Sequence, residues 1–413
     1  MATKETIIYV TREIERALGM APNEHYRIVT NRTTYGESIQ KQYPDFVTLI
    51  TDPENPGQES LGTGDLMRHP ETEKLVADLT QKTGARPYIL VFKNTARIEP
   101  LARERGWLLI NPPAATSEKI ENKVSQVTWL GELEPRLPSH GLSFTKSIVW
   151  RGTPFVIQWA HGHTGTGTIL IDDETKLVSL KERFPDRRCR VTDFVKGPSF
   201  TVNAIVTPEQ TAISSVSYQI TGLAPFTASR FATIGNDWSV AKTLLSPSDL
   251  ADIKKLAEDL GEKMRREFWR GLFGIDLIKD AATGKLYLIE VNARQPASTT
   301  FESNLQERQR AEGHSQGLTT LEAHISALLG QPLRQQLIQI IDGAQIVQRV
   351  TPTVKSVRED AIGSLELAGY QTISYPNTAE NEDLLRVQSL DGIMKGHDEL
   401  NDKGKEIAET LKQ

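Results

Sequence analysis

The sequence predicts a mixed α/β and α+β fold that is divided into several domains. Its first third alternates short apolar runs with helical patterns, its middle is rich in consecutive strand-like runs, and residues 271–294 form a strand–turn–strand pattern that carries acidic side chains. Alternating strands and helices favour a parallel sheet, whereas consecutive strands favour antiparallel pairing. With a usual domain size of roughly 100–200 residues, the chain is long enough for two to four domains.

The N-terminal residues predict an open, Rossmann-like parallel sheet domain over residues 1–115. Helical patterns over Pro70–Lys82 and Thr95–Arg105 end at Gly84 and Gly106, and glycine commonly terminates a helix. No G-x-G-x-x-G motif follows the first apolar run, so a dinucleotide fingerprint is absent there. The runs expected to form strands are Thr6–Val10, Tyr26–Thr30, Phe46–Ile50, Tyr88–Phe92 and Trp107–Ile110.

Residues 116–190 predict a helix followed by antiparallel strands. Ser117 can cap the helix, and Ile120, Val124 and Val127 form an apolar stripe with Lys123 beside it. The apolar runs of this part and of the next, residues 191–330, are Phe144–Val149, Phe155–Trp159, Thr168–Ile171, Cys189–Val195, Phe200–Val206 and Ala212–Ile220.

The clearest helix of the sequence begins at Ser246-Pro247, with Asp249 in its first turn. From residue 331 to residue 413 we expect a small α+β unit. It contains a strand over Ala344–Val350 and a helical end over Leu400–Lys412.

The acidic hairpin predicts a magnesium site. Asp276 lies in the run Leu272–Ile278, and an Ala-Thr-Gly turn separates this run from Tyr287–Val291. Because side chains alternate along a strand, Glu290 and Asn292 share one face, and Asp276 on the paired strand can face them. Magnesium prefers such oxygen ligands and leaves coordination positions open for phosphate oxygens. An ordinary hairpin with solvated acids is the alternative.

A glycine- and threonine-rich loop between two strand-like runs is typical of a phosphate-binding lid. Glycine allows close approach of the backbone, and its N–H groups together with threonine hydroxyls suit an anion. A flexible hairpin connection and half of a histidine metal site are the alternatives. The loop residues assigned to phosphate binding are His163, Thr164, Gly165 and Gly167.

The composition and net charge indicate which kinds of partner the protein binds. The formal net charge is −5, which argues against a broadly basic nucleic-acid surface and favours a small-molecule partner. The N-terminal residues lack the apolar core of a signal peptide, and no stretch approaches about 18 uninterrupted apolar residues. Cys189 is the single cysteine, so an intramolecular disulfide is impossible. We therefore expect a cytoplasmic protein that does not contact a membrane, and a homodimer would be unsurprising.

The order of these motifs resembles the ATP-grasp superfamily over roughly residues 1–330. A lysine-bearing helix, a glycine-rich hairpin loop, the segment Thr192–Val202, Asp276 and the run Glu290-Val291-Asn292-Ala293-Arg294 follow one another in that order. Segments like Asn122-Lys123 and Ile289–Arg294 occur in biotin carboxylase and in the large subunit of carbamoyl-phosphate synthetase. The downstream segment Gly317–His324 also looks like this branch.

The resemblance implies a role for individual residues. Lys123 would contact the nucleotide phosphates, and Arg294 would stabilise the transferred phosphoryl group or the acyl intermediate. Asp193, Phe194 and Val195 would border the adenine. Asp276, Glu290 and Asn292 would hold two Mg²⁺ ions. Mn²⁺ is an alternative metal.

Two positions depart from the family pattern. Gln158 stands where the family usually has its second phosphate-binding lysine, and Lys146 or a protonated His163 can substitute for the missing charge. Ser199 stands where related ligases have an acidic residue for the ribose hydroxyls. The complete metal set still argues for triphosphate binding, because clustered carboxylates without a cation would repel one another.

The resemblance therefore implies an ATP-dependent ligase that joins a small-molecule carboxylate, such as an amino acid or peptide, to an amine through an acyl phosphate. Arg230 is a candidate clamp for the substrate carboxylate, because a guanidinium binds a carboxylate bidentately, and a surface arginine is the alternative. Two other functions stay open. One is formation of a carboxy-phosphate or carbamoyl product, and the other is nucleotide binding without turnover.

Overall fold

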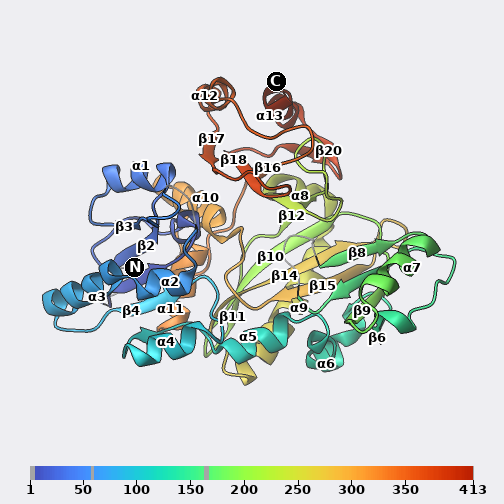
Figure 1. The fold of residues 1–413 in the computed structure, drawn as a ribbon, viewed down its shortest axis with the longest axis horizontal. Coiled ribbons are helices and arrows are strands. Elements are labelled where there is room, and N and C mark those ends of the chain that lie inside the picture. The colour runs from blue at the N-terminus through green and yellow to red at the C-terminus, as the bar shows by residue number, and fades with distance from the viewer. Residues whose placement is uncertain (1–4, 57–59, 162–166, 413) are drawn as a thin grey trace.

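The computed structural model of the protein describes residues 5–56, 60–161 and 167–412. It contains a five-stranded parallel sheet, a four-stranded antiparallel sheet, a nine-stranded sheet and a two-stranded ribbon. In Figure 1 the parallel sheet lies at the left, the four-stranded sheet lies at the right, and the long sheet runs between them toward the C-terminal strands at the top. The predicted mixture of α/β and α+β structure is confirmed.

The N-terminal sheet is parallel throughout, with the order β3-β2-β1-β4-β5. All five predicted strands are present: β1 (Ile7–Val10), β2 (Tyr26–Asn31), β3 (Val47–Ile50), β4 (Tyr88–Val91) and β5 (Leu108–Leu109). Gly84 ends α3 in the left-handed conformation, as predicted, whereas the second predicted helix begins only at Ile98. The connections contain η1 (Ile14–Ala17), α1 (Thr34–Gln42), α2 (Thr63–Arg68), α3 (Pro70–Thr83) and α4 (Ile98–Glu104).

The helix predicted to begin at Ser117 and to continue through Val127 is wrong. The structure has two helices, α5 (Ala114–Glu121) and α6 (Ser125–Leu130), which are followed by η2 (Gly131–Arg136). The Asn122 side chain breaks the helix because its oxygen accepts hydrogen bonds from the backbone N–H groups of Val124 (3.0 Å) and Ser125 (3.3 Å). Ser117 lies inside α5 instead of capping it, and Lys123 lies in the break.

The four-stranded sheet has the order β6-β9-β7-β8, and α7 (Glu174–Arg183) packs against it. Its strands are β6 (His140–Phe144), β7 (Phe155–Trp159), β8 (Thr168–Ile171) and β9 (Arg188–Asp193). The strand predicted over Phe144–Val149 is wrong, because β6 ends where that run begins. The turn η3 (Thr145–Ser147) follows, and the Thr145 hydroxyl donates to the Arg187 carbonyl at 2.9 Å.

The nine-stranded sheet has the order β15-β14-β10-β12-β13-β16-β18-β17, with β11 paired to β10. The single strand predicted over Ala212–Ile220 is wrong, since the serines at its centre leave the ladder. Ser214 donates to Glu302, and Ser215 accepts from the Ile340 N–H at 2.8 Å. The strands are β10 (Ser199–Val206), β11 (Thr211–Ile213), β12 (Ser217–Thr221), β13 (Thr233–Asp237), β14 (Gly271–Lys279), β15 (Leu286–Asn292), β16 (Ala344–Arg349), β17 (Gln371–Ser374) and β18 (Asp383–Ser389).

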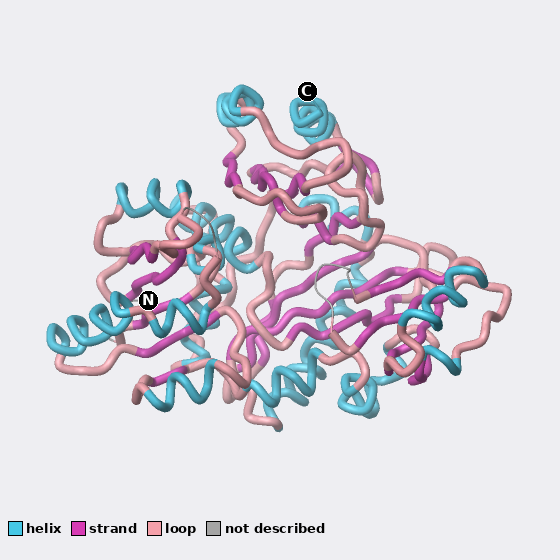
Figure 2. The backbone as a smooth tube through the Cα atoms, in the orientation of Figure 1, coloured by secondary structure: helices cyan, strands magenta, loops and turns pink. Residues whose placement is uncertain are grey.

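The C-terminal strands β16, β18 and β17 extend this sheet beyond β13. Figure 2 shows the strands continuing upward into the C-terminal part, where helices lie at the outside. The division of the chain at residues 115, 190 and 330 stays a prediction. The remaining elements are α8 (Trp238–Leu244), α9 (Pro247–Arg266), α10 (Thr299–Ala311), α11 (Thr320–Leu328), α12 (Glu359–Leu367), β19 (Met394–Gly396), β20 (Glu399–Leu400) and α13 (Asp402–Lys412).

Helices α9 and α11 cover opposite faces of the central strands. Phe273 and Ile275 pack in the same core as α9, whereas their neighbour Leu272 packs in the core that contains α11. Ser246 caps α9 in a capping box with Asp249, as its sequence predicts. Because side chains alternate, the face opposite α9 is the one that carries Asp276.

Helix α11 also connects two sheets, because Leu321 and Ile325 pack into the core of the N-terminal sheet while Ala323 and Ala327 pack against β10 and β14. None of the helices in the described ranges combines the length and the apolar character that crossing a membrane requires.

Candidate active site

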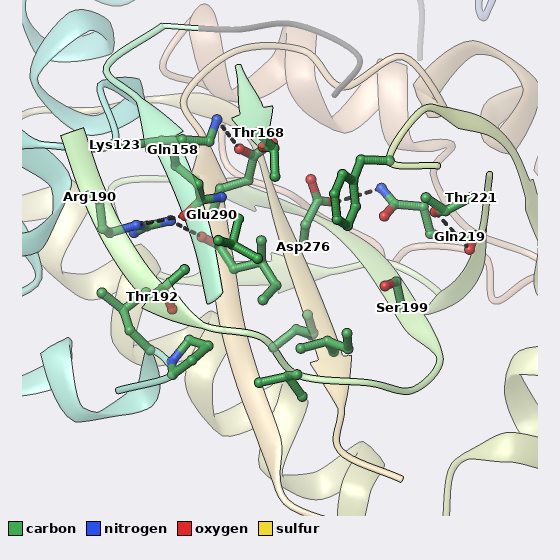
Figure 3. A pocket seen from close by; sticks show the side chains of 18 of the residues that line it. Lys123, Gln158, Thr168, Arg190, Thr192, Ser199, Gln219, Thr221, Asp276 and Glu290 are labelled. Carbon is green, nitrogen blue, oxygen red and sulfur yellow. Dashed lines mark hydrogen bonds and ion pairs between the residues drawn. The ribbon is translucent and has the colours of Figure 1, made fainter. Parts of the chain in front are cut away.

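A cavity of about 200 Å³ lies between the four-stranded sheet and the strands β10, β14 and β15. Both sheets contribute side chains to it, and Figure 3 shows them converging. Its polar and charged lining residues are Lys123, Gln158, Thr168, Arg190, Thr192, Asp193, Ser199, Gln219, Thr221, Thr233, Asp276 and Glu290. Its apolar lining residues are Leu137, Pro138, Val156, Val195, Phe231, Leu277, Ile278 and Ile289.

The hairpin of β14 and β15 brings the predicted acidic cluster together. Asp276 pairs with Glu290 across the ladder, and Gly274 pairs with Asn292. The Asp276 carboxylate accepts hydrogen bonds from the Thr201 hydroxyl at 2.7 Å and from the Asn292 amide at 3.0 Å. These side chains therefore share one face of the sheet at the cavity wall, as the alternation of residues predicts.

The pKa values of the Asp276 and Glu290 carboxyl groups are shifted in opposite directions. Burial, and then the nearby charge of Glu290, raises the pKa of Asp276 to about 7. Burial also opposes ionisation of Glu290, but Lys123 and Arg294 outweigh it and lower the pKa of Glu290 to about 2. The repulsion between the two carboxylates thus falls on the pKa of Asp276, as is usual for two acids that share one site.

This donor set fits a magnesium ion. It offers the carboxylate oxygens of Asp276 and Glu290 together with the amide oxygen of Asn292, which are hard ligands. A bound cation would remove the repulsion that raises the pKa of Asp276. Among the described residues, no group of three or more His, Cys, Asp and Glu side chains could hold a metal by itself, so ligands from a phosphate or water would have to complete the shell.

Lys123 is buried beside the acidic cluster. Its side chain is 9% exposed and forms an ion pair with Glu290, and its backbone N–H donates to the Ala160 carbonyl at 3.1 Å. The latter bond ties the break between α5 and α6 to the end of β7. Lys123 thus places a cation at the cavity wall, and its contact with phosphate stays a prediction.

Gln158 is also buried, and its partner is an arginine that sequence reasoning missed. Arg190 on β9 lies directly opposite Gln158 on β7, and its Nε donates to the Gln158 Oε1 at 2.9 Å. Figure 3 shows both side chains on the same side of the cavity as Lys123. The available signal was that this arginine stands inside the predicted strand run Cys189–Val195.

Other residues of the cavity lining border the predicted adenine segment. Asp193, Val195 and Ser199 line the cavity, whereas Phe194 does not, and their roles at the nucleotide stay predictions. Phe194 instead contacts Phe231 edge to face, with 6.5 Å between the ring centroids. Gln219 lies near Ser199 in Figure 3 and donates to Asp276 at 3.4 Å, a contact that the sequence did not indicate.

The two arginines proposed for catalysis lie outside the lining. The Arg294 guanidinium donates to Glu121 of α5 at 2.5 Å, and Glu121 also pairs with Lys93. Arg294 remains close enough to Glu290 to lower the pKa of that carboxyl group. Arg230 is exposed and lies over the Phe194 ring at 5.3 Å.

The remaining predicted residues are Lys146, expected to replace the missing lysine charge, and those of the glycine-rich loop. Lys146 is exposed and pairs with Asp186 at 2.6 Å, away from the lining. Gly167 is buried, and its carbonyl accepts from the Trp159 N–H at 2.9 Å. His163, Thr164 and Gly165 lie outside the described residues.

Comparisons with known proteins agree with this architecture. Residues 120–298 match the family model described as an ATP-grasp domain. No curated protein sequence matches the chain. Among solved structures, an ADP complex of N5-carboxyaminoimidazole ribonucleotide synthetase is similar over 100% of this chain and 99% of its own, with 13% identity and a TM-score of 0.65.

Two further structures are similar over most of their length. N5-carboxyaminoimidazole synthetase from Staphylococcus aureus, complexed with ADP, covers 98% of this chain and 97% of its own, with 12% identity and a TM-score of 0.64. L-amino acid ligase from Bacillus licheniformis covers 93% of both chains, with 13% identity and a TM-score of 0.60. At this identity the likeness establishes the fold.

The cavity lies between two antiparallel sheets and is lined by basic side chains and by a pair of acids. Residues 120–298 match the ATP-grasp domain model, and the chain shares the fold of the solved structures named above.

Proposed function

We propose that this protein is an ATP- and Mg²⁺-dependent ligase that joins a carboxylate to an amine through an acyl-phosphate intermediate. The observation that supports this most directly is the arrangement of Lys123, Asp276 and Glu290 around one cavity of an ATP-grasp domain. A cation suits the phosphate chain, and the acids with Asn292 suit magnesium. Apolar lining residues such as Val156, Val195 and Phe231 suit a nucleobase.

The reaction balances in two steps. In the first, an oxygen of the substrate carboxylate attacks the γ-phosphorus, the bond to the bridging oxygen breaks, and ADP leaves with the electron pair. In the second, the amine nitrogen attacks the acyl carbon, the bond from that carbon to the phosphate oxygen breaks, and the nitrogen loses a proton. The products are an amide, ADP and inorganic phosphate.

The residues of the chain would mainly position groups and neutralise charge. Lys123 would contact the phosphates, and Arg294, held by Glu121, would stabilise charge on the transferred phosphoryl group. Asp276, Glu290 and Asn292 would hold two magnesium ions, or Mn²⁺, which neutralise the β- and γ-phosphates. Exclusion of water from the acyl phosphate would then favour attack by the amine.

For the acid, we propose an amino acid or peptide, as the name of the Bacillus licheniformis ligase suggests. A second candidate is bicarbonate, which would give a carboxy-phosphate. It is favoured by the similarity, over 98–100% of this chain, to structures named N5-carboxyaminoimidazole ribonucleotide or N5-carboxyaminoimidazole synthetase. We further propose a cytoplasmic location, in line with the single cysteine, and a homodimer.

The test is ADP formation by the purified protein with Mg²⁺ and ATP. One panel offers amino acids and dipeptides, a second offers bicarbonate with amines, and mass spectrometry identifies the product. We expect acceptor-dependent ADP and a condensed product, both abolished in the double variant Asp276→Ala/Glu290→Ala. Glu258→Ala, which removes an exposed acid of α9, should retain activity.

Nucleotide binding without ADP formation across both panels would contradict the ligase and support a binding protein without turnover. Failure to bind ATP or ADP would contradict the proposed site as a whole.

A further inference from the structure

Arg190 is a buried cation whose bonded acceptors are all neutral. Its residue is 2% exposed, and the guanidinium donates to the side-chain oxygens of Gln158 (2.9 Å) and Gln126 (3.4 Å) and to the Ile289 carbonyl (2.7 Å). No carboxylate in the described part of the chain forms an ion pair with it. Lys123 differs, because Glu290 pairs with it directly.

A buried charge without a counterion is costly, so its presence at a cavity wall indicates a missing anion. Burial lowers the pKa of Arg190 to about 10, with Glu290 opposing the shift, so the guanidinium still carries its charge at neutral pH. A guanidinium has five N–H groups, and the bonds described above use one on each nitrogen. The two that remain can donate to a ligand.

The three neutral acceptors hold the guanidinium plane from different elements. Gln158 belongs to β7, Ile289 to β15 and Gln126 to α6. This frame spans both walls of the cavity, so the orientation of Arg190 is fixed before a ligand binds. Such preorganisation lowers the entropic cost of ion pairing.

The position of Arg190 also accounts for the glutamine at residue 158. The two residues are direct partners in the antiparallel ladder of β7 and β9. Side chains opposite one another have Cβ atoms about 4.5–5.5 Å apart, so a cation on either strand can serve the same part of the cavity. Gln158 occupies the expected place of a lysine, and the positive charge stands one strand away.

We propose that Arg190 binds the phosphate chain of the nucleotide, and that β9 supplies the cation which β7 lacks. The inference rests on the proposed function, because it assigns a residue to the same nucleotide site. In this proposal Gln158 is a positioning residue, because its side-chain oxygen accepts a hydrogen bond from the Arg190 Nε and so orients the guanidinium.

The test compares affinities for ADP and for adenosine by calorimetry. We expect Arg190→Gln to weaken ADP binding by about 10- to 100-fold, the usual range for loss of a charge-assisted bond, and adenosine binding by less than about 3-fold. The exchange Gln158→Lys/Arg190→Gln returns the cation to β7 and should recover most of the ADP affinity. Arg183→Gln removes an exposed arginine of α7 and should bind like the wild type.

Each outcome decides a different point. Wild-type protein that binds no ADP would refute the proposed function and this inference with it. Wild-type binding combined with equal effects of Arg190→Gln on ADP and adenosine would overturn the inference alone. If Arg190→Gln does not fold, the exchanged pair provides the comparison, and equal losses of ADP and adenosine affinity in that pair would overturn the inference.

Discussion

Glu302 provides a test of how a buried acid controls the stability of this protein. It lies on α10, is 1% exposed, and accepts hydrogen bonds from Ser214, Asn203 and the Thr320 hydroxyl (2.9 Å). Burial raises the pKa of Glu302 to about 7. The Asn203 Oδ1 is buried without a partner, and rotation of this carboxamide would let it accept a hydrogen bond from the protonated Glu302.

The sign of the effect follows from linkage. The folded-state pKa of Glu302, about 7, lies above its ordinary value of 4.5, so the folded protein retains a proton that the unfolded chain releases. The corresponding stability is complete below the ordinary pKa and is lost as the pH rises through the folded pKa. At about 1.4 kcal/mol per pKa unit, the loss between pH 5 and pH 8 is about 2–3 kcal/mol.

Urea titrations at pH 5 and pH 8 measure this loss. Glu302→Gln cannot ionise, so its free energy of unfolding should fall less than that of the wild type over this range, by about 2–3 kcal/mol. Glu312→Gln removes a more exposed acid just beyond the end of the same helix and should follow the wild type. Parallel pH dependence in Glu302→Gln and the wild type would refute the raised pKa.

Three further substitutions test local features. Lys123→Met should weaken ADP binding by about 10-fold or more and leave adenosine binding little changed. Lys146→Met should have no effect, because the Lys146 ammonium group pairs with Asp186 outside the cavity. Equal losses of ADP affinity in the two variants, measured by calorimetry, would contradict this. Ser246→Ala should lower the free energy of unfolding by about 1 kcal/mol through loss of the capping box, and an unchanged urea midpoint would disprove it. Gly271→Ala should cost about 2 kcal/mol or more, because φ is 86° and the added Cβ would lie 2.5 Å from the His324 ring; a wild-type melting temperature would contradict the clash.

The acidic hairpin could be predicted because the interactions that form it are local. Alternation along two strands and a short turn determine which side chains share a face, and Asp276 does pair with Glu290. The sequence did not reveal the register shift between Asp276 and Leu277, but that shift lies beyond the pair. Side chains brought together within one hairpin are therefore within reach of sequence reasoning.

The surroundings of Lys123 could not be predicted in the same way. The apolar stripe favoured one continuous helix, but the Asn122 side chain competes for the backbone N–H groups and divides it. The groups that then hold Lys123 are the Ala160 carbonyl and Glu290, which are distant in sequence. Helical periodicity could not predict either contact, because it only indicates which residues of one helix share a face.

Arg190 shows why a missing residue in a motif does not establish a missing function. A motif assigns the phosphate cation to one position along β7, and at that position the chain has Gln158. Arg190 lies opposite Gln158 in the ladder of β7 and β9, and Gln158 accepts a hydrogen bond from its guanidinium. In our proposal the phosphate cation therefore stands on β9, 32 positions along the chain from Gln158. The residues that matter at this site are a pair on neighbouring strands. Such a pair can be recognised in a sequence only when the register of the two strands is known.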